Sequence, residues 1–387
     1  MGKIFTNDNS TQLYMDAFVA LENEGDIVAP RGKDIKELRP VIVEFTNPLN
    51  RVTFLEDRRI NPFFQQAEAL WIAAGRSDVE FLLKYNQNMG EFSDDGVYFN
   101  APYGERLRFW NKNDLTGQII NPIDQLVDVY EKLLKDWDTR QAVAQIWNPM
   151  FDNSSYEGKD FPCNMTLCFK IRKNKLHLTV YNRSNDLHYG TFGANLCQFA
   201  TIQEMVASWL GIEVGTYNQV TDSLHIYLKD YGYKESDKIK KAYGLTGDTL
   251  EAPEVKHFTF ENEPRIKSTL QETTAFLDVL FNQGFVETLH NDAAFEQVEV
   301  QEQIMTFATA IPDEYFRTNV LSMVAYRAHK LKQFDAMVHA LSEMQDCQWK
   351  LSCLFFLHKF YADSALFKEL YAHYSSDKIR YIEGKRV

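Results

Sequence analysis

The sequence lacks the run of about 20 apolar residues that a helix needs to span a bilayer, and it lacks a Cys-x-x-Cys pair. Its start, MGKIFTNDNS, has no apolar segment of the kind found in secretory signals. The number of cysteines is odd, and they stand at Cys163, Cys168, Cys197, Cys347 and Cys353. This usage is typical of a reduced chain without disulfides or structural zinc. We therefore expect a cytoplasmic protein with no membrane contact and no bound metal.

Positive charge is also scarce. The 387 residues include 41 Lys+Arg against 54 Asp+Glu, which gives a formal net charge of −13. Such a mean field repels phosphate and excludes general binding to nucleic acid or to anionic membranes, although a local basic pocket for one small phosphate is compatible with it. Hydrophobic residues make up 45% of the chain and charged residues 25%, as in ordinary soluble proteins. The length predicts two or three domains.

The hydrophobic pattern divides the chain into four parts. Residues 1–26 are polar with one short amphipathic stretch, which predicts an arm or helix on the surface. Residues 27–245 alternate strand-like runs with helices, which predicts an α/β domain. Residues 246–264 are irregular and polar, as in a linker. Residues 265–387 have apolar residues at helical spacing, which predicts an all-α C-terminal extension.

Local signals indicate several individual elements. Residues 41–45 are rich in β-branched side chains and predict a strand. Asn61-Pro62 predicts the start of a helix, because Asn caps helices and Pro is tolerated at the first helical position. Two strands joined by a short turn are expected at 167–172 and 175–181. In the C-terminal extension, helices are expected over 313–331, 333–344 and 347–360.

Residues that can carry chemistry are concentrated between positions 160 and 231. In order, they are Pro162-Cys163, Arg183-Ser184-Asn185-Asp186, Gly190, Asn195 and His225-Ile226-Tyr227. Taken singly, each has an ordinary explanation, since a cysteine beside a strand is more often a small core residue than a nucleophile. The order and spacing of the whole set favour an enzyme site.

This set resembles the thymidylate synthase family, whose pattern is Pro-Cys, a hairpin, Arg-Ser-x-Asp, then Gly and Asn, then His-x-Tyr. Upstream, Glu68-Ala69-Leu70-Trp71, Pro102-Tyr103-Gly104 and Asp138-Thr139-Arg140 are similar to other blocks of that family. The resemblance covers residues 27–231, about half of the chain. It implies a three-layer α/β fold with a large bent mixed sheet, to which the all-α extension is added. It also implies a homodimer whose sheets pack together.

The resemblance implies covalent catalysis on a pyrimidine nucleotide. Cys163 would add as a thiolate to C6 of the base, with Arg183 as the nearby cation. The C5 carbon could then capture the one-carbon unit of 5,10-methylenetetrahydrofolate, the expected cosubstrate. Glu68 and Tyr103 would organise water for proton transfer at the base.

Binding roles follow from the same resemblance. The 5′-phosphate would be held by Arg31, Arg183 and Ser184, with Arg140 reaching in from the partner subunit. His225 and Tyr227 would take the ribose hydroxyl. The folate would lie against Asp186, Gly190 and Met89.

Asn195 matters most for the choice of base. A neutral amide can accept from N3–H and donate to O4 of uracil, whereas relatives that act on deoxycytidylate carry Asp at this position. Asn195 therefore favours dUMP. The spacing from Gly190 to Asn195 is one residue longer than the usual family spacing, which makes Ala194 the alternative occupant of this position.

Two departures from the family bear on the outcome of the reaction. Met89 stands where a tryptophan is usual, and the helical extension replaces the short apolar tail that closes over the folate. Both changes could admit water to the reactive intermediate. We therefore expect hydroxymethylation of dUMP, as in phage enzymes that supply modified bases, in which case the location is the host cytoplasm. The alternatives are a thymidylate synthase, a deoxycytidylate hydroxymethylase and a catalytically silent binding protein.

Overall fold

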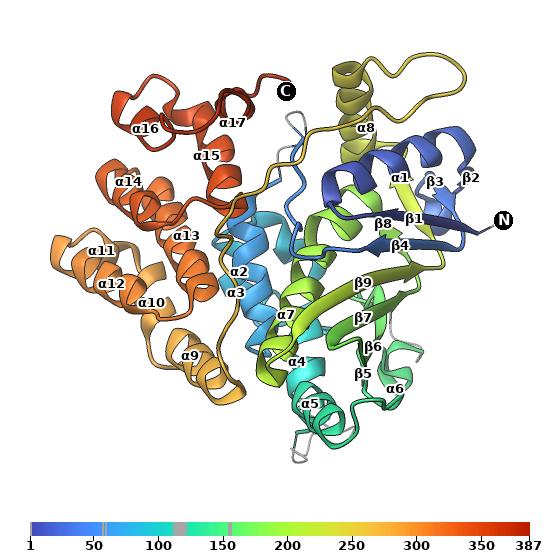
Figure 1. Ribbon diagram of the computed structural model, residues 1–387, viewed down its shortest axis with the longest axis horizontal. Coiled ribbons are helices and arrows are strands. Elements are labelled where there is room, and N and C mark those ends of the chain that lie inside the picture. Colours follow the sequence, from blue (N-terminus) through green and yellow to red (C-terminus); the bar gives the residue numbers. More distant parts are fainter. Residues whose placement is uncertain (1, 56–57, 59, 111–121, 154–156) are drawn as a thin grey trace.

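The computed structural model describes residues 2–55, 58, 60–110, 122–153 and 157–387 (Figure 1). Its centre is a six-stranded mixed sheet, in which β1–β4 and β7–β9 are parallel pairs and the other neighbours are antiparallel. In spatial order the strands are β1 (Lys3–Asn7), β4 (Val41–Phe45), β9 (Glu213–Thr221), β7 (Lys175–Asn182), β6 (Asn164–Arg172) and β5 (Val143–Gln145). A smaller sheet contains β2 (Asp26–Val28), β3 (Ile35–Leu38), β10 (Leu224–Tyr227) and β8 (Asn185–Asp186).

The expected hairpin is present as β6 and β7. Its two turn residues, Lys173 and Asn174, have φ values of 52° and 59°, which is the left-handed conformation of a two-residue hairpin turn. Leu167 faces Val180 across the pair, and both side chains are buried. The strand alternation therefore directs one face of the sheet to the core.

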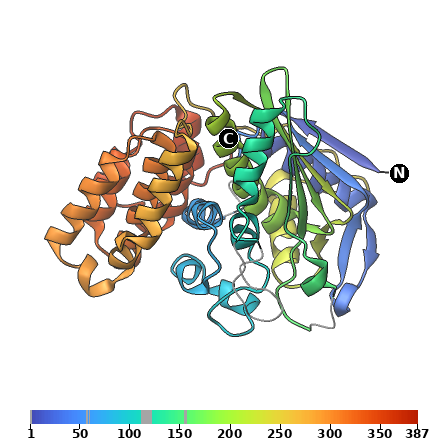
Figure 2. The same cartoon turned by 90° about the horizontal axis from the view of Figure 1, so that it is seen from below.

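Helices cover that core face in two layers (Figure 2). The buried helix α7 (Leu196–Leu210) packs directly on β7 and β9, and on its other side it contacts α2 (Pro62–Ala73). The helix α5 (Gln125–Lys135) also contacts α7. The sheet, α7 and α2 thus form the successive layers that the α/β expectation requires.

The first residues of the chain are not a surface arm, contrary to the expectation for residues 1–26. Strand β1 pairs in parallel with β4 at the edge of the large sheet. The following helix α1 (Ser10–Glu24) is capped by Asn9 and is buried through Leu13, Tyr14 and Phe18, all fully inaccessible. The polar sequence of residues 1–26 did not reveal strand β1, because its partner β4 lies more than 30 residues downstream.

Helix α2 carries the first of the predicted site residues. Its N-cap is Asn61, whose side chain accepts from the backbone of Phe63 and Phe64, and Pro62 occupies the first helical position. Both parts of the expected helix start are confirmed. The cap is half-buried and fixes where α2 begins.

Shorter helices connect these layers. The α-helices are α3 (Val79–Leu83), α4 (Tyr103–Arg108), α6 (Pro149–Asp152) and α8 (Asp230–Tyr243). Two 3₁₀ turns, η1 (Pro30–Gly32) and η2 (Gln87–Phe92), and one π-helix, η3 (Leu187–Asn195), complete the α/β part.

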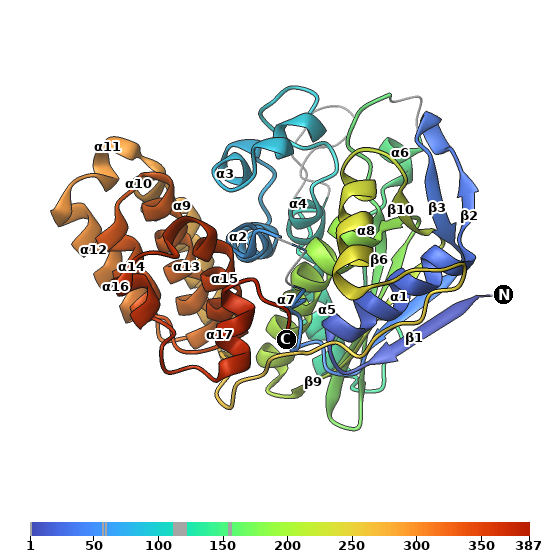
Figure 3. The same ribbon diagram turned by 90° about the horizontal axis from the view of Figure 1, so that it is seen from above.

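The C-terminal extension is all-helical, as its sequence predicts (Figure 3). Its helices are α9 (Leu270–Asn282), α10 (Phe285–His290), α11 (Asp292–Phe295), α12 (Val298–Ala310), α13 (Glu314–Lys330), α14 (Phe334–Glu343), α15 (Gln348–Tyr361), α16 (Ala365–Glu369) and α17 (Ser376–Ile382). Before them, residues 244–269 contain no helix or strand. Among the described residues, no helix is long and apolar enough to cross a membrane.

The extension is joined to the α/β part through buried contacts. The Arg51 guanidinium lies 2.5 Å from the Glu204 carboxylate, and both side chains are at most 4% exposed. The other Glu204 oxygen accepts from the backbone N–H of Ile266, at the entry to the extension. Arg51 also lies over the ring of Tyr315 in α13. Because a buried charge must keep its partners, these contacts hold the two parts in one arrangement.

Candidate active site

A cavity of about 350 Å³, called here the first cavity, lies between the sheet edge and α2. Ten of the thirteen predicted site residues line it: Arg31, Glu68, Met89, Tyr103, Cys163, Arg183, Asp186, Gly190, Asn195 and Tyr227. Positions spread over nearly 200 residues of sequence are therefore brought together in one place. Such convergence of polar groups in a cleft is the usual mark of a ligand site.

Cys163 is half-buried immediately before β6, and it is not in a disulfide. Arg183, just beyond the end of β7, donates to the carbonyls of Pro162 (2.9 Å) and Phe161 (3.2 Å). Its Nη2 also lies 3.7 Å from Sγ of Cys163. The guanidinium therefore fixes the backbone before the thiol and is placed to stabilise negative charge on the sulfur.

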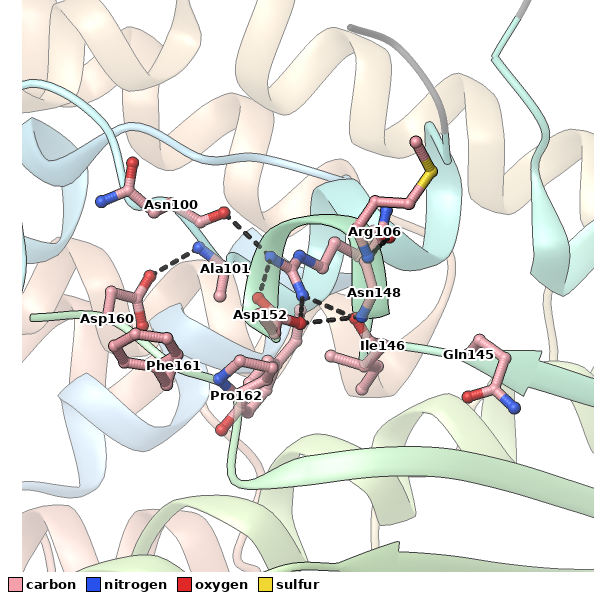
Figure 4. Close-up of polar contacts among 12 residues, drawn as sticks. Asn100, Ala101, Arg106, Gln145, Ile146, Asn148, Asp152, Asp160, Phe161 and Pro162 are labelled. Atoms are coloured by element: carbon pink, nitrogen blue, oxygen red, sulfur yellow. Dashed lines mark hydrogen bonds and ion pairs between the residues drawn. The ribbon is translucent and has the colours of Figure 1, made fainter. Parts of the chain in front are cut away.

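A second network supports the same segment from the other side (Figure 4). Arg106 in α4 forms a bidentate ion pair with Asp152 at 2.6 and 2.9 Å, and it donates to the carbonyls of Asn100 and Ile146. Asp160 accepts from the backbone N–H of Ala101 at 2.7 Å. Burial raises the pKa of Asp160. These bonds tie the chain on both sides of the first cavity together, so the approach to Cys163 is held in place.

Tyr103 contacts the nucleophile candidate directly. Its hydroxyl accepts from the backbone N–H of Cys163 at 3.3 Å. Burial, and then the charge of Cys163, raise the pKa of Tyr103, so the phenol stays protonated near neutral pH. A neutral hydroxyl beside the sulfur can relay a proton through water without adding charge.

Glu68 is the buried carboxyl of the first cavity. It is 7% exposed, and burial raises its pKa to about 7, with a hydrogen bond to Gln198 acting in the opposite direction. Its Oε2 is buried without a partner among the described residues. A carboxyl that titrates near neutral pH can both accept and donate a proton.

Asn195 is linked to Glu68 by the same glutamine. The Asn195 Nδ2 donates to Gln198 Oε1 at 3.1 Å, and both residues are buried. Because Gln198 has one acceptor and one donor group, its contact with Asn195 leaves the amide nitrogen for Glu68. Sequence reasoning missed Gln198, since a glutamine inside an apolar helix carries no motif.

The extra residue between Gly190 and Asn195 falls within the π-helix η3. A π-helix takes one more residue per turn than an α-helix, so an insertion is absorbed without moving either end. Both Ala194 and Asn195 line the first cavity, but Asn195 supplies the polar side chain. Gly190 is needed for space, because a Cβ there would lie 2.5 Å from Oδ1 of Asn185.

Asp186 caps η3 through Oδ1, which accepts from the backbone N–H of Tyr189 at 2.6 Å. Its Oδ2 is buried without a partner among the described residues. Burial raises the pKa of Asp186, against the opposing effect of His225, its neighbour across β8 and β10. The cavity therefore presents a carboxylate oxygen ready for a ligand N–H.

His225, Ser184 and Arg140 do not line the first cavity. His225 is 6% exposed, and its ring lies 5.2 Å from that of Tyr227, which does line the cavity. Ser184 is half-buried next to Arg183, and Arg140 is exposed. Arg31 is exposed at the rim in η1, with a φ of 52°.

Lys159 is a cation of the first cavity that sequence reasoning also missed. Its Nζ lies 3.3 Å from the carbonyl of Ser93. No pattern in the neighbouring residues singles it out, because the loop reaches the cavity only through the fold. Among the described residues, no group of three or more His, Cys, Asp or Glu side chains is arranged to hold a metal ion.

A second cavity, of about 470 Å³, adjoins the first. The two share four lining residues, Glu68, Met89, Phe92 and Ala194. The rest of its lining comes mainly from α2 and from the segment after α3. In the described part of the chain, no residue beyond Tyr227 lines either cavity.

Comparison with known proteins finds relatives of this chain. Residues 20–273 match the thymidylate synthase family. A protein of Bacillus phage SP01 named deoxyuridylate hydroxymethyltransferase is 53% identical over 363 residues, which span 93% of this chain and 94% of the phage protein. The chain belongs to the thymidylate synthase family.

Two other relatives widen the comparison. A deoxyuridylate hydroxymethyltransferase of Pseudomonas phage M6 is 35% identical over 227 residues, which span 58% of this chain and 62% of that protein. A putative thymidylate synthase of Methanosarcina mazei is 30% identical over 239 residues, 61% of this chain and 94% of its own length. The alignment with the SP01 protein covers 93% of this chain, so the SP01 protein has a counterpart of most of the helical extension.

Replacing Glu68 by Gln is expected to change how stability depends on pH. The folded-state pKa of about 7 exceeds the ordinary 4.5, so the unfolded chain loses this proton first as the pH rises. As the pH rises from 4.5 to about 7, Glu68 is thus expected to lower the free energy of unfolding by up to about 3 kcal/mol. Denaturant titrations at acid and mildly alkaline pH should show this decline in the wild type and not in Glu68→Gln. Equal pH dependence in both proteins would contradict the assignment.

Proposed function

We propose that this protein transfers a one-carbon unit from 5,10-methylenetetrahydrofolate to C5 of dUMP and completes the reaction with water, which gives 5-hydroxymethyl-dUMP. The observation that carries the proposal is the meeting of Cys163, Arg183, Glu68 and Asn195 in one cavity. The 53% identity with the SP01 phage deoxyuridylate hydroxymethyltransferase supports the same reaction.

The first step uses Cys163. Its thiolate adds to C6 of the uracil, and the Arg183 guanidinium at 3.7 Å stabilises the sulfur as an anion before attack. Electron density then accumulates at C5 and O4. Asn195, with its side chain fixed by Gln198, donates to O4 and accepts from N3–H. C5 thereby becomes the carbon nucleophile.

The folate supplies the one-carbon unit that C5 captures. Glu68 and Tyr103 then handle the protons at the base through water, because one titrates near neutral pH and the other stays protonated. Loss of the C5 proton and cleavage of the bond between the transferred carbon and the folate nitrogen release tetrahydrofolate and leave an exocyclic methylene on the nucleotide. Water adds to that methylene, and departure of Cys163 from C6 restores the ring.

The second cavity is where we place the folate. Aromatic side chains line it, Phe64, Tyr85, Phe92 and Tyr189, and it opens to the first cavity beside Glu68. Asp186 and Gly190 line the first cavity, so in this proposal the pterin extends past Met89, which lines both cavities, and one of its N–H groups donates to the unpartnered Oδ2 of Asp186. Aromatic side chains together with a carboxylate acceptor fit a flat heteroaromatic group that carries ring N–H donors.

Water is favoured as the final acceptor by the same geometry. Met89 lines both cavities together with Phe92, and the resemblance to the family places a tryptophan at the position of Met89. Among the described residues, none from the C-terminal extension lines either cavity. An open path to the exocyclic methylene allows hydration to compete with hydride transfer.

A homodimer completes the phosphate site in this proposal. Arg31 and Arg183 line the first cavity and Ser184 follows Arg183, while Arg140 is exposed outside the cavity and would act on the phosphate of a second copy. The sheet face opposite α7 supports such pairing. Its side chains are half-buried or exposed and mostly uncharged, for example Thr166, Cys168, Thr179, Tyr181, Asn218 and Val220.

The reaction itself is tested by product mass. Purified protein with dUMP and methylenetetrahydrofolate is expected to give a nucleotide heavier by CH₂O, without formation of dihydrofolate. The Cys163→Ala variant should give no product and capture no nucleotide, because no other thiol lines the first cavity in the described chain. A product heavier by CH₂, with dihydrofolate released, would instead make this protein a thymidylate synthase.

The choice of base is tested by Asn195→Asp. A carboxyl accepts from the cytosine amino group and repels O4, so the ratio of kcat/KM for dUMP over dCMP should fall by about 10- to 100-fold. Asn88→Asp, which places the same change in the second cavity, should leave the ratio unchanged. A wild-type preference for dCMP would refute the assignment of Asn195.

The dimer is tested by a substitution that places a charge on the sheet face opposite α7. Tyr181 is 42% exposed there, and Tyr181→Lys should convert a dimer to monomers in light scattering because like charges meet across the two-fold axis. The exposed Tyr233 in α8 provides the matched control, Tyr233→Lys. The Tyr181 variant should also show a higher KM for dUMP, through loss of Arg140 of the partner. A monomeric wild type would rule the arrangement out.

A further inference from the structure

Among the described residues, none from the helical extension lines either cavity, yet the extension contacts the lining of the second one at Tyr85. Tyr85 follows α3 and is 5% exposed. Its hydroxyl lies 3.1 Å from Nε2 of His290 at the end of α10. Its ring stacks on Tyr326 of α13 at a centroid distance of 5.4 Å and an interplanar angle of 16°. The extension therefore holds both the ring and the hydroxyl of this tyrosine.

The backbone of Tyr85 is held as well. Its carbonyl accepts from the Tyr326 hydroxyl at 3.1 Å and from the Asn61 amide at 3.1 Å. Asn61 is itself a lining residue of the second cavity and the N-cap of α2. One carbonyl thus joins three elements, namely the end of α3, the start of α2 and the middle of α13.

Tyr326 also packs on α2 directly. Its ring stacks on Phe63 at 5.0 Å and 28°, one turn before Glu68. Helix α13 lies along α2 in two views of the molecule (Figures 1 and 3) and contacts it. The chain after Tyr85 continues into η2, which carries Met89 and Phe92 to the junction of the cavities. Displacement of Tyr85 would therefore shift both sides of that junction.

The partners of Tyr85 are themselves fixed within the extension. Arg327 donates to the carbonyls of Leu289 and His290, both at 3.1 Å, and so anchors the end of α10 to α13. Burial lowers the pKa of His290 to about 3, so its imidazole is neutral and its contact with Tyr85 does not depend on pH near neutrality. Phe81 of α3 adds ring contacts to Phe281 and His290.

We propose that Tyr326 and His290 are positioning residues for the folate, and that the helical extension serves this reaction by holding Tyr85 and the start of α2 in the lining of the second cavity. The inference rests on the proposed function, because it assigns the second cavity to the folate. It gives the extension a catalytic purpose without any direct contact with substrate.

The inference predicts an effect on one substrate and not on the other. Tyr85, Phe63 and Phe81, which Tyr326 and His290 contact, do not line the first cavity, where Cys163 and Arg183 would bind the nucleotide. Loss of one net hydrogen bond corresponds to a change of about threefold to tenfold. The KM for methylenetetrahydrofolate should therefore rise by that factor in Tyr326→Phe, while the KM for dUMP stays within twofold.

A matched control lies in the same extension. Tyr374→Phe removes a hydroxyl that donates to Asp346 at 2.8 Å. Neither residue lines the first or the second cavity, so this variant should change neither KM. All proteins are full-length, and thermal unfolding with far-UV circular dichroism checks that each is folded. An equal rise of both KM values, or a folded Tyr326→Phe with unchanged folate KM, would overturn the inference.

A second set of variants keeps the test decisive if Tyr326→Phe folds poorly. Tyr85→Phe and His290→Phe remove the two ends of one hydrogen bond and retain both rings. Each should raise the folate KM, and the double variant should raise it no further than either single one. Additive effects would contradict the shared role. A wild type that makes no product from dUMP would instead refute the proposed function.

Discussion

The chemistry of the site depends on the contacts of one guanidinium. Arg183 bonds to the carbonyls of Phe161 and Pro162 and lies beside the sulfur of Cys163, so the same group sets the position and the charge environment of the nucleophile candidate. Backbone carbonyls are rigid acceptors, and they orient the guanidinium more firmly than flexible side chains would. A lysine could supply the charge at this position, but it could not form this planar fork.

Burial of polar groups is the second constraint on the site. Glu68, Gln198 and Asn195 form a row between α2 and α7, and each is at most 7% exposed. In such surroundings a polar group that lacks a partner is costly, so the order of donors and acceptors along the row is restricted. This restriction favours one orientation of the Asn195 amide, which our proposal uses to discriminate between uracil and cytosine.

Sequence spacing was sufficient to predict the first cavity, because Cys163, Arg183, Asp186 and Asn195 recur in a family pattern. It could not predict residues whose role arises from tertiary packing. Gln198 and Lys159 reach the cavity from an apolar helix and an irregular loop, where neither periodicity nor motif marks them. The N-terminal residues were wrongly expected on the surface, since their polar sequence conceals a strand whose partner β4 is distant in the chain.

The helical extension illustrates the same limit on a larger scale. Its helices could be predicted from the spacing of apolar residues along the chain. Its proposed role depends on which helix faces contact α2, and the contacts of Tyr326 join residues more than 200 positions apart. A tail that closes over a ligand shields it from water, whereas a fixed support behind the lining shapes the cavity and leaves its mouth open. An enzyme that must admit water to a methylene intermediate benefits from the second arrangement, because binding of the folate and access of water are then controlled by different parts of the chain.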